Sequence, residues 1–437
     1  MPLDSKLPFA RLDPVTYLPN RQQFAADAEE GYPEDGHCVM ITLTDAVHFN
    51  GILRALGHDY SDDFIRAGAA RIRGAVPPAI ALYHVSVLSF CFIFPGDPET
   101  LVTELMAGFA TPLLSGGIPI STRAGIGVTN CGNASAADML RTSLAAAQDS
   151  RKTVSGWARY DSHADTAHRR GFFMLSQLTA AMEAKNQLSL HFQPKYDLSS
   201  GQPTSAEALI RWQHPTLGAI SPAEFIPLAE ATDYIHPLTS WVLAQAMEEA
   251  ARWQEAGLKL KMAVNVSPHN LSRRGFAAQV EKIIRTHGVD PAKFEFEFTE
   301  GALAANNPVV LAELAELRAF GCKIALDDFG TGFSNFSYIT HLPADIIKID
   351  QSFIRRIDVD ERSGLVVRAI IHLAHRLSYS VVAEGIETAD TYQLLKDWRC
   401  DEGQGYFMSR PVDALSFGKL MVKSGQLPVV NRQSSED

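Results

Sequence analysis

The sequence lacks the features that mark membrane proteins and secreted proteins. No apolar run approaches the roughly 18–20 residues that a membrane-spanning helix needs. The first fourteen residues lack the basic segment followed by an apolar segment that is typical of a signal peptide. These two absences predict a cytoplasmic protein with no membrane partner.

Paired cysteines and an excess of positive charge are also missing. The five cysteines are scattered and form no Cys-x-x-Cys pair, which argues against a zinc site and against a disulfide framework. The formal net charge of -11 argues against non-specific binding to DNA or RNA, because that binding depends on positive side chains. A phosphate substrate is compatible with this charge only where local cations hold it.

What is present is the composition of an ordinary globular protein. Of the 437 residues, 46% are hydrophobic and 20% are charged, as in soluble domains generally. The length predicts about two or three domains. We expect one domain over residues 1–163, a second over 164–426, and a disordered tail over 427–437.

The first of these domains mixes strand patterns with helical spacing. The polar stretch at 150–165 predicts its boundary, and helical spacing at 172–185 predicts a helix that leads into the second domain. Together these patterns predict a small α/β or α+β domain. The predicted strands are 39–43, 81–85, 90–94 and 118–128, and the predicted helices are 62–74 and 136–151.

Three motifs of this domain are distinctive, namely LDPVTYLPNRQQF at 12–24, the segment from Phe49 to Asp62, and Gly125-Ile126-Gly127. They resemble the motifs of the GGDEF (diguanylate cyclase) family. The family's signature pentapeptide, however, falls on SVLSF at 86–90, which has none of its glycines or acids. The flanking motifs of the family are therefore present, but its signature pentapeptide is not.

The other functional positions of that family are also altered. One metal-binding aspartate is kept as Asp45, but the second position is Val47, and apolar residues cannot hold Mg²⁺. The guanine-contacting asparagine position is Leu53, and the inhibitory product site falls on Pro77 and Ile80. We therefore predict a non-cyclase domain. It is either a structural or dimerisation module, or a regulatory module whose partner is GTP or a protein.

The second domain alternates short apolar runs with helical stretches. This alternation predicts βα units and a mainly parallel sheet, and eight units in about 250 residues predict a (β/α)₈ barrel of the TIM type. The predicted strands are 188–193, 205–212, 261–266, 293–298, 323–327, 346–350, 380–384 and 402–407.

The most informative stretch is 322–350, CKIALDDFGTGFSNFSYITHLPADIIKID. A short apolar run ends on Asp327 and Asp328 before a Gly-rich turn, and a second run ends on Lys348 and Asp350. Paired carboxylates repel each other, and a divalent cation, which prefers oxygen ligands, relieves that repulsion. The alternative for these acids is a solvated turn with helix-capping residues.

A polar residue lies late on nearly every predicted strand or just beyond it, with Glu207 earlier than the others. Active sites of such barrels lie at the carboxyl ends of the strands. We see no matching set of basic partners, and unpaired buried carboxylates are costly, so the ring predicts a metal site. Its members are Gln193, Glu207, Asn265, Glu297, Asp327, Lys348, Glu384 and Gln404.

Glu207-Ala208-Leu209, followed by Ile-Arg-Trp, resembles the signature of EAL phosphodiesterases. FQPKYDL, SPAEFIPLAEAT, NVSP, FEFTE, DDFGTG, IKID, AEGIE and QGYFMSRP continue the resemblance over about 170–425. It implies hydrolysis of cyclic di-GMP to linear pGpG with two Mg²⁺ or Mn²⁺ ions, and a homodimer formed through this domain. Ca²⁺ is expected to inhibit, because its looser coordination would misplace the attacking water.

The resemblance implies a role for each position. Glu207, Asn265, Glu297 and Asp327 match metal ligands, and Asp328 and Glu384 match the surroundings of the second metal. Lys348 and Asp350 lie beside the attacking water, Glu300 anchors the loop at 330–337, and Glu387 supports the metal surroundings. The candidate catalytic residues are thus Glu207, Glu300, Lys348, Asp350 and Glu384, and the candidate substrate-binding residues are Gln193, Arg211, Asn265 and Gln404, with Arg211 on a phosphate and Gln193 on a guanine.

Two other functions stay open at this point. One is a cyclic di-GMP receptor that does not cleave its ligand, and the other is an interaction scaffold. The complete set of ligand residues favours the enzyme, since two bound ions make a water ionise near neutral pH. Whether Lys348 takes the proton of that water is left open.

Overall fold

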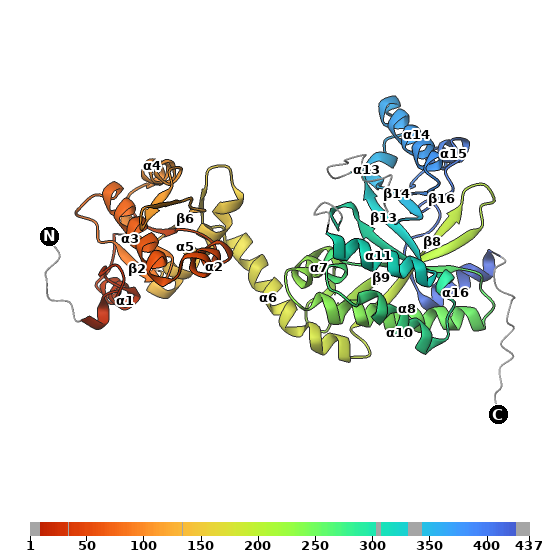
Figure 1. Ribbon diagram of the computed structural model, residues 1–437, viewed down its shortest axis with the longest axis horizontal. Coiled ribbons are helices and arrows are strands. Elements are labelled where there is room, and N and C mark those ends of the chain that lie inside the picture. The colour runs from red at the N-terminus through yellow and green to blue at the C-terminus, as the bar shows by residue number, and fades with distance from the viewer. Residues whose placement is uncertain (1–8, 34, 133, 303–306, 331–342, 425–437) are drawn as a thin grey trace. The chain divides into compact units, whose positions relative to one another are not determined.

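The computed structural model describes residues 9–424, except 34, 133, 303–306 and 331–342 (Figure 1). Most of the loop predicted at 330–337 and the tail predicted at 427–437 lie outside the described residues. The chain divides into two compact units, Met1–Arg170 and Gly171–Asp437, and the division falls within helix α6 (Ser162–Glu183). None of the described helices is long and apolar enough to cross a bilayer.

The first unit is a sheet of strand order β2-β3-β1-β6-β7 with helices against it. Its pairings are antiparallel except for β6 with β7. The α/β fold predicted for this part of the chain is confirmed. The elements are η1 (Phe9–Arg11), α1 (Arg21–Glu29), β1 (Gly36–Thr42), α2 (Ala46–Leu56), α3 (His58–Ala75), β2 (Tyr83–Ser86), β3 (Ser89–Pro95), α4 (Glu99–Phe109), β4 (Leu113–Ser115), β5 (Ile118–Ile120), β6 (Gly125–Asn130), α5 (Ala136–Asp149), η2 (Ser150–Lys152) and β7 (Trp157–Arg159).

One local prediction in this unit was wrong. The strand predicted at 118–128 is two strands, because β5 pairs with β4 in a separate hairpin whereas β6 joins the main sheet. The polar residues between them interrupt the apolar run, and a continuous strand does not form. The polar stretch at 150–165, where the boundary is predicted, contains β7 and the start of α6.

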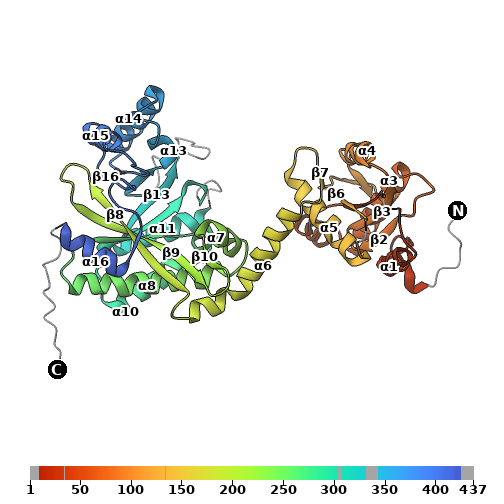
Figure 2. The same cartoon turned by 180° about the vertical axis from the view of Figure 1, so that it is seen from behind.

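The second unit is a closed barrel of eight strands surrounded by helices, which confirms the predicted TIM-type fold. Figure 2 shows α8, α10 and α16 outside the strands. The elements are β8 (Leu188–Asp197), β9 (Pro203–His214), β10 (Gly218–Ile220), α7 (Pro222–Glu230), α8 (Ile235–Glu255), β11 (Lys261–Asn265), α9 (Pro268–Leu271), α10 (Phe276–His287), η3 (Pro291–Lys293), β12 (Phe294–Thr299), η4 (Glu300–Ala302), α11 (Pro308–Phe320), β13 (Lys323–Phe329), β14 (Ile346–Ile349), α13 (Gln351–Ile354), α14 (Glu361–Arg376), β15 (Ser380–Ala383), α15 (Ala389–Asp397), β16 (Glu402–Gly403), β17 (Val412–Asp413) and α16 (Ala414–Lys423).

One strand of the barrel departs from the repeated βα unit. Strand β8 runs antiparallel to both of its barrel neighbours, β9 and β16, and it is joined to β9 by a tight turn instead of a helix. The pairing with β9 extends from Leu188 to Tyr196, whereas the pairing with β16 joins only two residues of each strand. The barrel therefore closes through one long hairpin and one short seam.

The inward faces of the strands form two layers. Residues near the carboxyl ends of the parallel strands make the upper layer, together with Gln193 of the antiparallel β8. The residue two positions further down on each strand belongs to a floor layer beneath it, because alternate residues of a strand share a face. The apolar part of the floor is a buried cluster of Ala325, Ile346 and Val382. The complete floor layer is Lys195, Ser205, Ala263, Glu295, Ala325, Ile346, Val382 and Glu402.

Candidate active site

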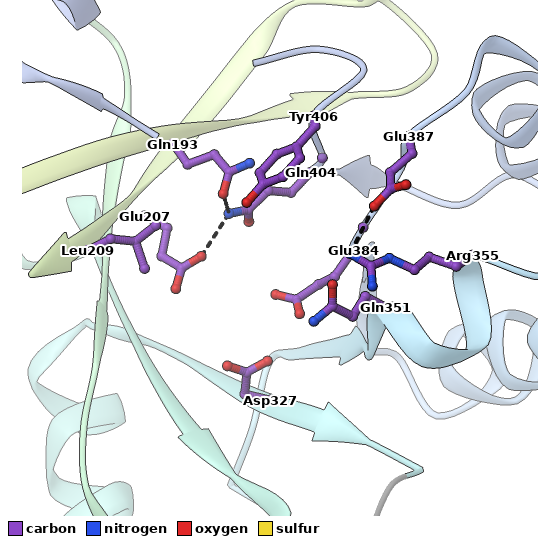
Figure 3. Close-up of a pocket in the computed structure, with 12 residues that line it drawn as sticks. Gln193, Glu207, Leu209, Asp327, Gln351, Arg355, Glu384, Glu387, Gln404 and Tyr406 are labelled. Atoms are coloured by element: carbon purple, nitrogen blue, oxygen red, sulfur yellow. Dashed lines mark hydrogen bonds and ion pairs between the residues drawn. The ribbon is translucent and has the colours of Figure 1, made fainter. Parts of the chain in front are cut away.

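The polar ring predicted from the sequence comes together at the carboxyl ends of the parallel strands. Adjacent members are fixed by strand register, which pairs Gln193 with Glu207 and Asn265 with Glu297. The carboxylates of Glu207, Asp327 and Glu384 point into one space (Figure 3), a cavity of about 210 Å³. The barrel thus concentrates negative charge in a single pocket.

Side-chain amides hold both oxygens of Glu207. Asn265 Nδ2 donates to Oε1 at 2.6 Å, and Gln404 Nε2 donates to Oε2 at 2.8 Å. Gln404 Nε2 also donates to Gln193 Oε1 at 2.9 Å, and Gln193 Nε2 donates to the carbonyl of Ser409 at 3.0 Å. Burial raises the pKa of Glu207. The carboxylate is therefore held in place, and a nearby cation would stabilise its negative charge.

Two buried lysines lie among these carboxylates. Lys348 Nζ lies 2.5 Å from Glu297 Oε2, 2.7 Å from Glu384 Oε1 and 3.1 Å from Asp327 Oδ1. Lys195 Nζ lies 2.6 Å from Glu295 Oε1 and 2.5 Å from Glu297 Oε1. The expectation that the ring has no basic partners was therefore wrong. Lys195 and Glu295 were missed, although their spacing from Gln193 and Glu297 places them on the same inward faces.

The lysines and the burial of the site act in opposite directions on the carboxyl groups. Burial opposes the ionisation of Glu297, but Lys195 and Lys348 outweigh it and lower the pKa of Glu297 to about 2. For Glu384 burial prevails over Lys348 and raises the pKa to about 8. Burial, together with the charge of Asp327, also raises the pKa of Asp328. Glu297 and Glu384, which both contact Lys348, thus differ in protonation near neutral pH.

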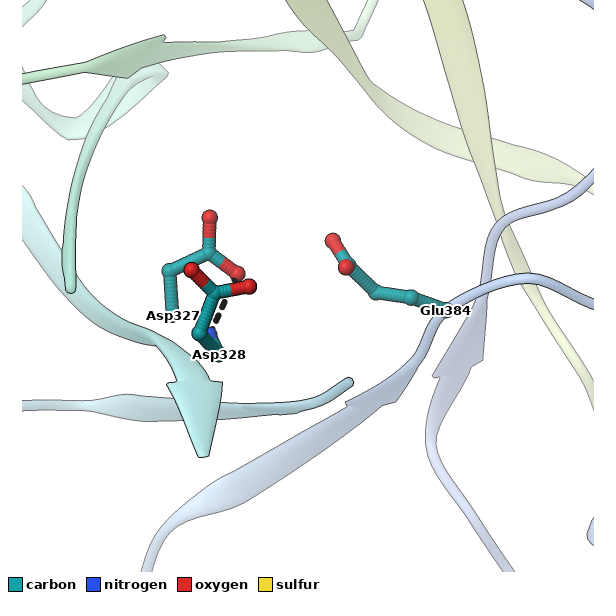
Figure 4. Close-up of side chains that lie close together, drawn as sticks. All are labelled: Asp327, Asp328 and Glu384. Carbon is teal, nitrogen blue, oxygen red and sulfur yellow. Dashed lines mark hydrogen bonds between the residues drawn. The ribbon is translucent and has the colours of Figure 1, made fainter. Parts of the chain in front are cut away.

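Asp327, Asp328 and Glu384 form the tightest cluster of acids. One ligand oxygen from each lies within 4.8 Å of the others, and Figure 4 shows Glu384 facing the two aspartates. Asp328 has a positive φ of 54°, and the register between β13 and β14 shifts between Leu326 and Phe329. Bulges of this kind redirect side chains beside active sites, and here both aspartates lie within one.

The donor set fits a divalent cation of the Mg²⁺ class. All three acids offer oxygen, the donor that Mg²⁺ prefers, and they offer it within 4.8 Å of one another. Glu207, Asn265 and Glu297 supply further oxygens beside Asp327. These residues would hold the two ions that the resemblance implies.

The predicted substrate-binding residues lie on two cavities that share Leu209. Gln193 and Gln404 line the first cavity. Arg211 and Asn265 line the second, of about 370 Å³, which is mainly apolar and also touches Glu297. The guanidinium of Arg211 donates to the carbonyl of Ile210 at 2.8 Å. The two cavities thus meet where Asn265 contacts Glu207.

The remaining predicted residues lie at the edges of the site. Glu300 Oε2 accepts from the backbone N–H of Gly330 at 3.4 Å, beside Asp328. Asp350 caps α13 by accepting from Ser352 N at 2.9 Å, and its charge contributes to the raised pKa of Asp328. Glu387 is half exposed and pairs with Arg355 at 2.8 Å.

Two glycines allow the loops after β15 and β16 to pack closely, one of them against the other loop and one against α13. A Cβ on Gly405 would lie 2.1 Å from the carbonyl oxygen of Ile386. Gly385 has a φ of 71°, and a Cβ there would lie 2.4 Å from that of Gln351. Both positions accept only glycine, and their close packing places Glu384 and Gln404 on facing walls of the pocket.

The pKa of Glu384 predicts a pH-dependent effect of Mg²⁺. Without the ion, Glu384 holds a proton below about pH 8. A cation that binds at about pH 6 must displace this proton, whereas at about pH 8.5 the carboxylate is free. Thermal unfolding in Mg²⁺ and in EDTA should therefore show a larger stabilisation by Mg²⁺ at the higher pH. Glu384→Gln should remove most of this difference, and equal stabilisation of the unaltered protein at both pH values would contradict the assignment.

In the first unit, the positions that depart from the GGDEF motifs, and the one aspartate that is kept, have the following contacts and exposure. Asp45 caps α2 by accepting from His48 N at 2.7 Å, and its other oxygen lies 3.5 Å from Arg123. Val47 is 82% exposed. Residues 86–90 span the turn between β2 and β3. Asp45 is thus engaged in local structure.

Comparison with known proteins agrees with the geometry of both units. The family profile of the EAL domain matches residues 175–411, and that of the diguanylate cyclase GGDEF domain matches residues 10–154. In Pseudomonas aeruginosa, cyclic di-GMP phosphodiesterase PA2567 is 38% identical over 410 residues, which cover 92% of this chain and 70% of that protein. Cyclic di-GMP phosphodiesterase NbdA of the same species is 32% identical over 413 residues.

The alignment with NbdA covers 92% of this chain and 53% of NbdA, so the chain spans about half of that relative's length. Among solved structures, the complex named PaMucR phosphodiesterase with c-di-GMP is similar to the barrel. Its TM-score is 0.54 and its sequence identity is 35%, and the match covers 56% of this chain and 99% of that one.

Proposed function

Because the chain belongs to the EAL domain family and carries a GGDEF domain ahead of its EAL domain, we propose that its barrel is a phosphodiesterase that hydrolyses cyclic di-GMP to linear pGpG. The observation that carries the proposal is the buried ring of carboxylates and amides at the strand ends, whose oxygens suit divalent cations. The solved relative named as a c-di-GMP complex, which is similar over the barrel, supports the choice of ligand.

Two Mg²⁺ or Mn²⁺ ions, when bound, supply an acidified water and neutralise charge on the phosphate. The residues of the chain position the other participants. Arg211 lies on the wall of the second cavity, where its planar guanidinium suits a phosphate because it donates two parallel hydrogen bonds. Lys348 is buried and positively charged, and its ammonium stabilises negative charge that develops on the phosphate.

The two cavities suit a ligand with two bases on either side of phosphate groups. The first offers the amide of Gln193, which suits hydrogen bonds to the edge of a guanine. The second offers an apolar surface around Leu238 and Val242. Since the metal-binding residues lie where the cavities meet, we place the scissile phosphate between them.

We propose that the first unit is non-catalytic. Its altered motif positions offer one aspartate where a cyclase needs two, and that aspartate caps a helix. A regulatory role with GTP or a protein as partner, and a homodimer formed through the barrel, complete this proposal. We place the domains at 1–163 and 164–426.

Hydrolysis of cyclic di-GMP by the purified protein tests the proposal. With Mg²⁺ or Mn²⁺ we expect conversion to pGpG, followed by liquid chromatography, and with Ca²⁺ we expect little or none. Asp45→Ala alters the first unit alone and serves as the matched variant, which should retain turnover. If the protein binds cyclic di-GMP tightly but does not hydrolyse it with either metal, even with GTP present, it is a receptor and not an enzyme. If it does not bind cyclic di-GMP, the interpretation as an interaction scaffold is favoured.

A further inference from the structure

Lys195 lies in the floor layer, directly beneath the residues that would hold metal. Its side chain is fully buried, and its ammonium contacts one oxygen of Glu295 at 2.6 Å and one oxygen of Glu297 at 2.5 Å. Burial opposes the charge of Lys195, but Glu295 and Glu297 raise its pKa. The lysine is therefore charged, and it bridges the floor layer to the upper layer.

The two lysines divide the oxygens of Glu297 between them. Lys195 occupies Oε1 and Lys348 occupies Oε2. Lys348 also contacts Asp327 and Glu384, so its ammonium lies where the candidate metal ligands converge. Lys195 instead has Glu295, a floor-layer residue, as its second partner. Oε2 therefore faces the site of the ions, and Oε1 faces away from it.

Glu295 cancels the charge of Lys195. The two side chains pair at 2.6 Å, and together they add no net charge below the metal-binding residues. The pair thus supplies Glu297 with a hydrogen-bond donor without weakening the attraction of the site for cations. Partners of this kind, which contact a ligand residue and not the metal, change metal affinity by about 10- to 100-fold in other sites.

We propose that Lys195 is a positioning residue that holds Oε1 of Glu297 toward the floor layer. Glu297 then offers a divalent ion only Oε2, through the lone pair that does not accept from Lys348. This inference rests on the divalent-ion site of the proposed function. A carboxylate that binds through one oxygen suits Mg²⁺, which requires near-octahedral geometry, whereas Ca²⁺ also accepts both oxygens of one carboxylate and more ligands in total. Lys195 would thereby favour Mg²⁺ over Ca²⁺.

Cation selectivity, measured without substrate, tests the role of Lys195. The double variant Lys195→Met/Glu295→Gln removes the donor and keeps the net charge, and replacing a buried ion pair by neutral groups is often tolerated. Dissociation constants for Mg²⁺ and Ca²⁺ are obtained by competition with Mn²⁺, observed by electron paramagnetic resonance. We expect the preference for Ca²⁺ over Mg²⁺ to rise about tenfold in the double variant.

Two further variants test whether the change in selectivity is due to loss of the Lys195 contact with Glu297. Glu295→Gln keeps Lys195 on Glu297 and adds one positive charge, so both affinities should fall together and their ratio should stay unchanged. Ser205→Ala changes the same floor layer without touching Glu297, and it should bind as the unaltered protein does. An unchanged ratio in the double variant, or a shifted ratio in Glu295→Gln, would overturn the role of Lys195. Failure of the unaltered protein to bind any of the three cations would overturn the proposed metal site itself.

Discussion

Replacement of Glu207 by glutamine is expected to lower the kcat for cyclic di-GMP by about a thousandfold. Glu207 is buried, and both of its oxygens accept hydrogen bonds from amides. Glutamine removes the charge and turns an NH₂ group toward one of those donors. Loss of a metal ligand forfeits several kcal/mol of stabilisation of the transition state, and each 1.36 kcal/mol corresponds to a factor of ten in rate.

The assay compares initial rates of pGpG formation at saturating substrate. Glu281→Gln is the matched control, because Glu281 is on the outside of the barrel and pairs only with Arg285 among the described residues. We expect that control to retain its full rate. Binding of cyclic di-GMP in Ca²⁺, measured by calorimetry, should persist in Glu207→Gln. A kcat within about tenfold of the unaltered protein would exclude Glu207 as a metal ligand.

The second large effect concerns stability. Lys348→Met is expected to destabilise the metal-free barrel by about 3–5 kcal/mol, because removal of one partner leaves buried charges without compensation. Three carboxylates lose their cation, namely those of Glu297, Asp327 and Glu384. Mg²⁺ should restore much of the loss, since a divalent ion replaces the missing positive charge at the same carboxylates.

Urea unfolding at about pH 8 in EDTA and in Mg²⁺ measures this effect. Tryptophan fluorescence reports mainly on the barrel, because four of the five tryptophans, all but Trp157, lie in it. The loss should shrink at about pH 6, where Glu384 is protonated and has less need of a cation. Equal stability of the two proteins in EDTA, or a deficit that Mg²⁺ leaves unchanged, would show that Lys348 does not balance these carboxylates.

The sequence predicted seven strands of the barrel well, because each contains a short apolar run with a polar residue on or near it. The eighth, predicted at 402–407, is only Glu402–Gly403, which has no apolar run. The same pattern in the seven strands predicted which side chains meet. Asp327 and Lys348 are close because parallel strands end at one edge, and no knowledge of the loops is needed for that inference. The site was predictable where it follows from strand order alone.

The parts that were missed depend on pairing across the chain. Lys195 and Glu295 are a hundred residues apart along the chain, and neither one alone can be told from an ordinary charged residue on a strand. The positive φ of Asp328 follows from the shifted register between β13 and β14, which no local pattern encodes. In the first unit, the apolar parts of the run at 118–128 suggested one strand, but polar residues interrupt it and its first part pairs with β4 in a separate hairpin.

The short seam of the barrel has a consequence for motion. Strand β16 has only two residues, Glu402 and Gly403, and each of its pairings joins just those two to a neighbour. Local opening is easiest where few backbone hydrogen bonds must break. Gln404 and Tyr406 follow this strand directly and form one wall of the pocket. Local opening is therefore expected at this wall of the pocket, and amide hydrogens there should exchange with solvent sooner than those of β11, β12 and β13.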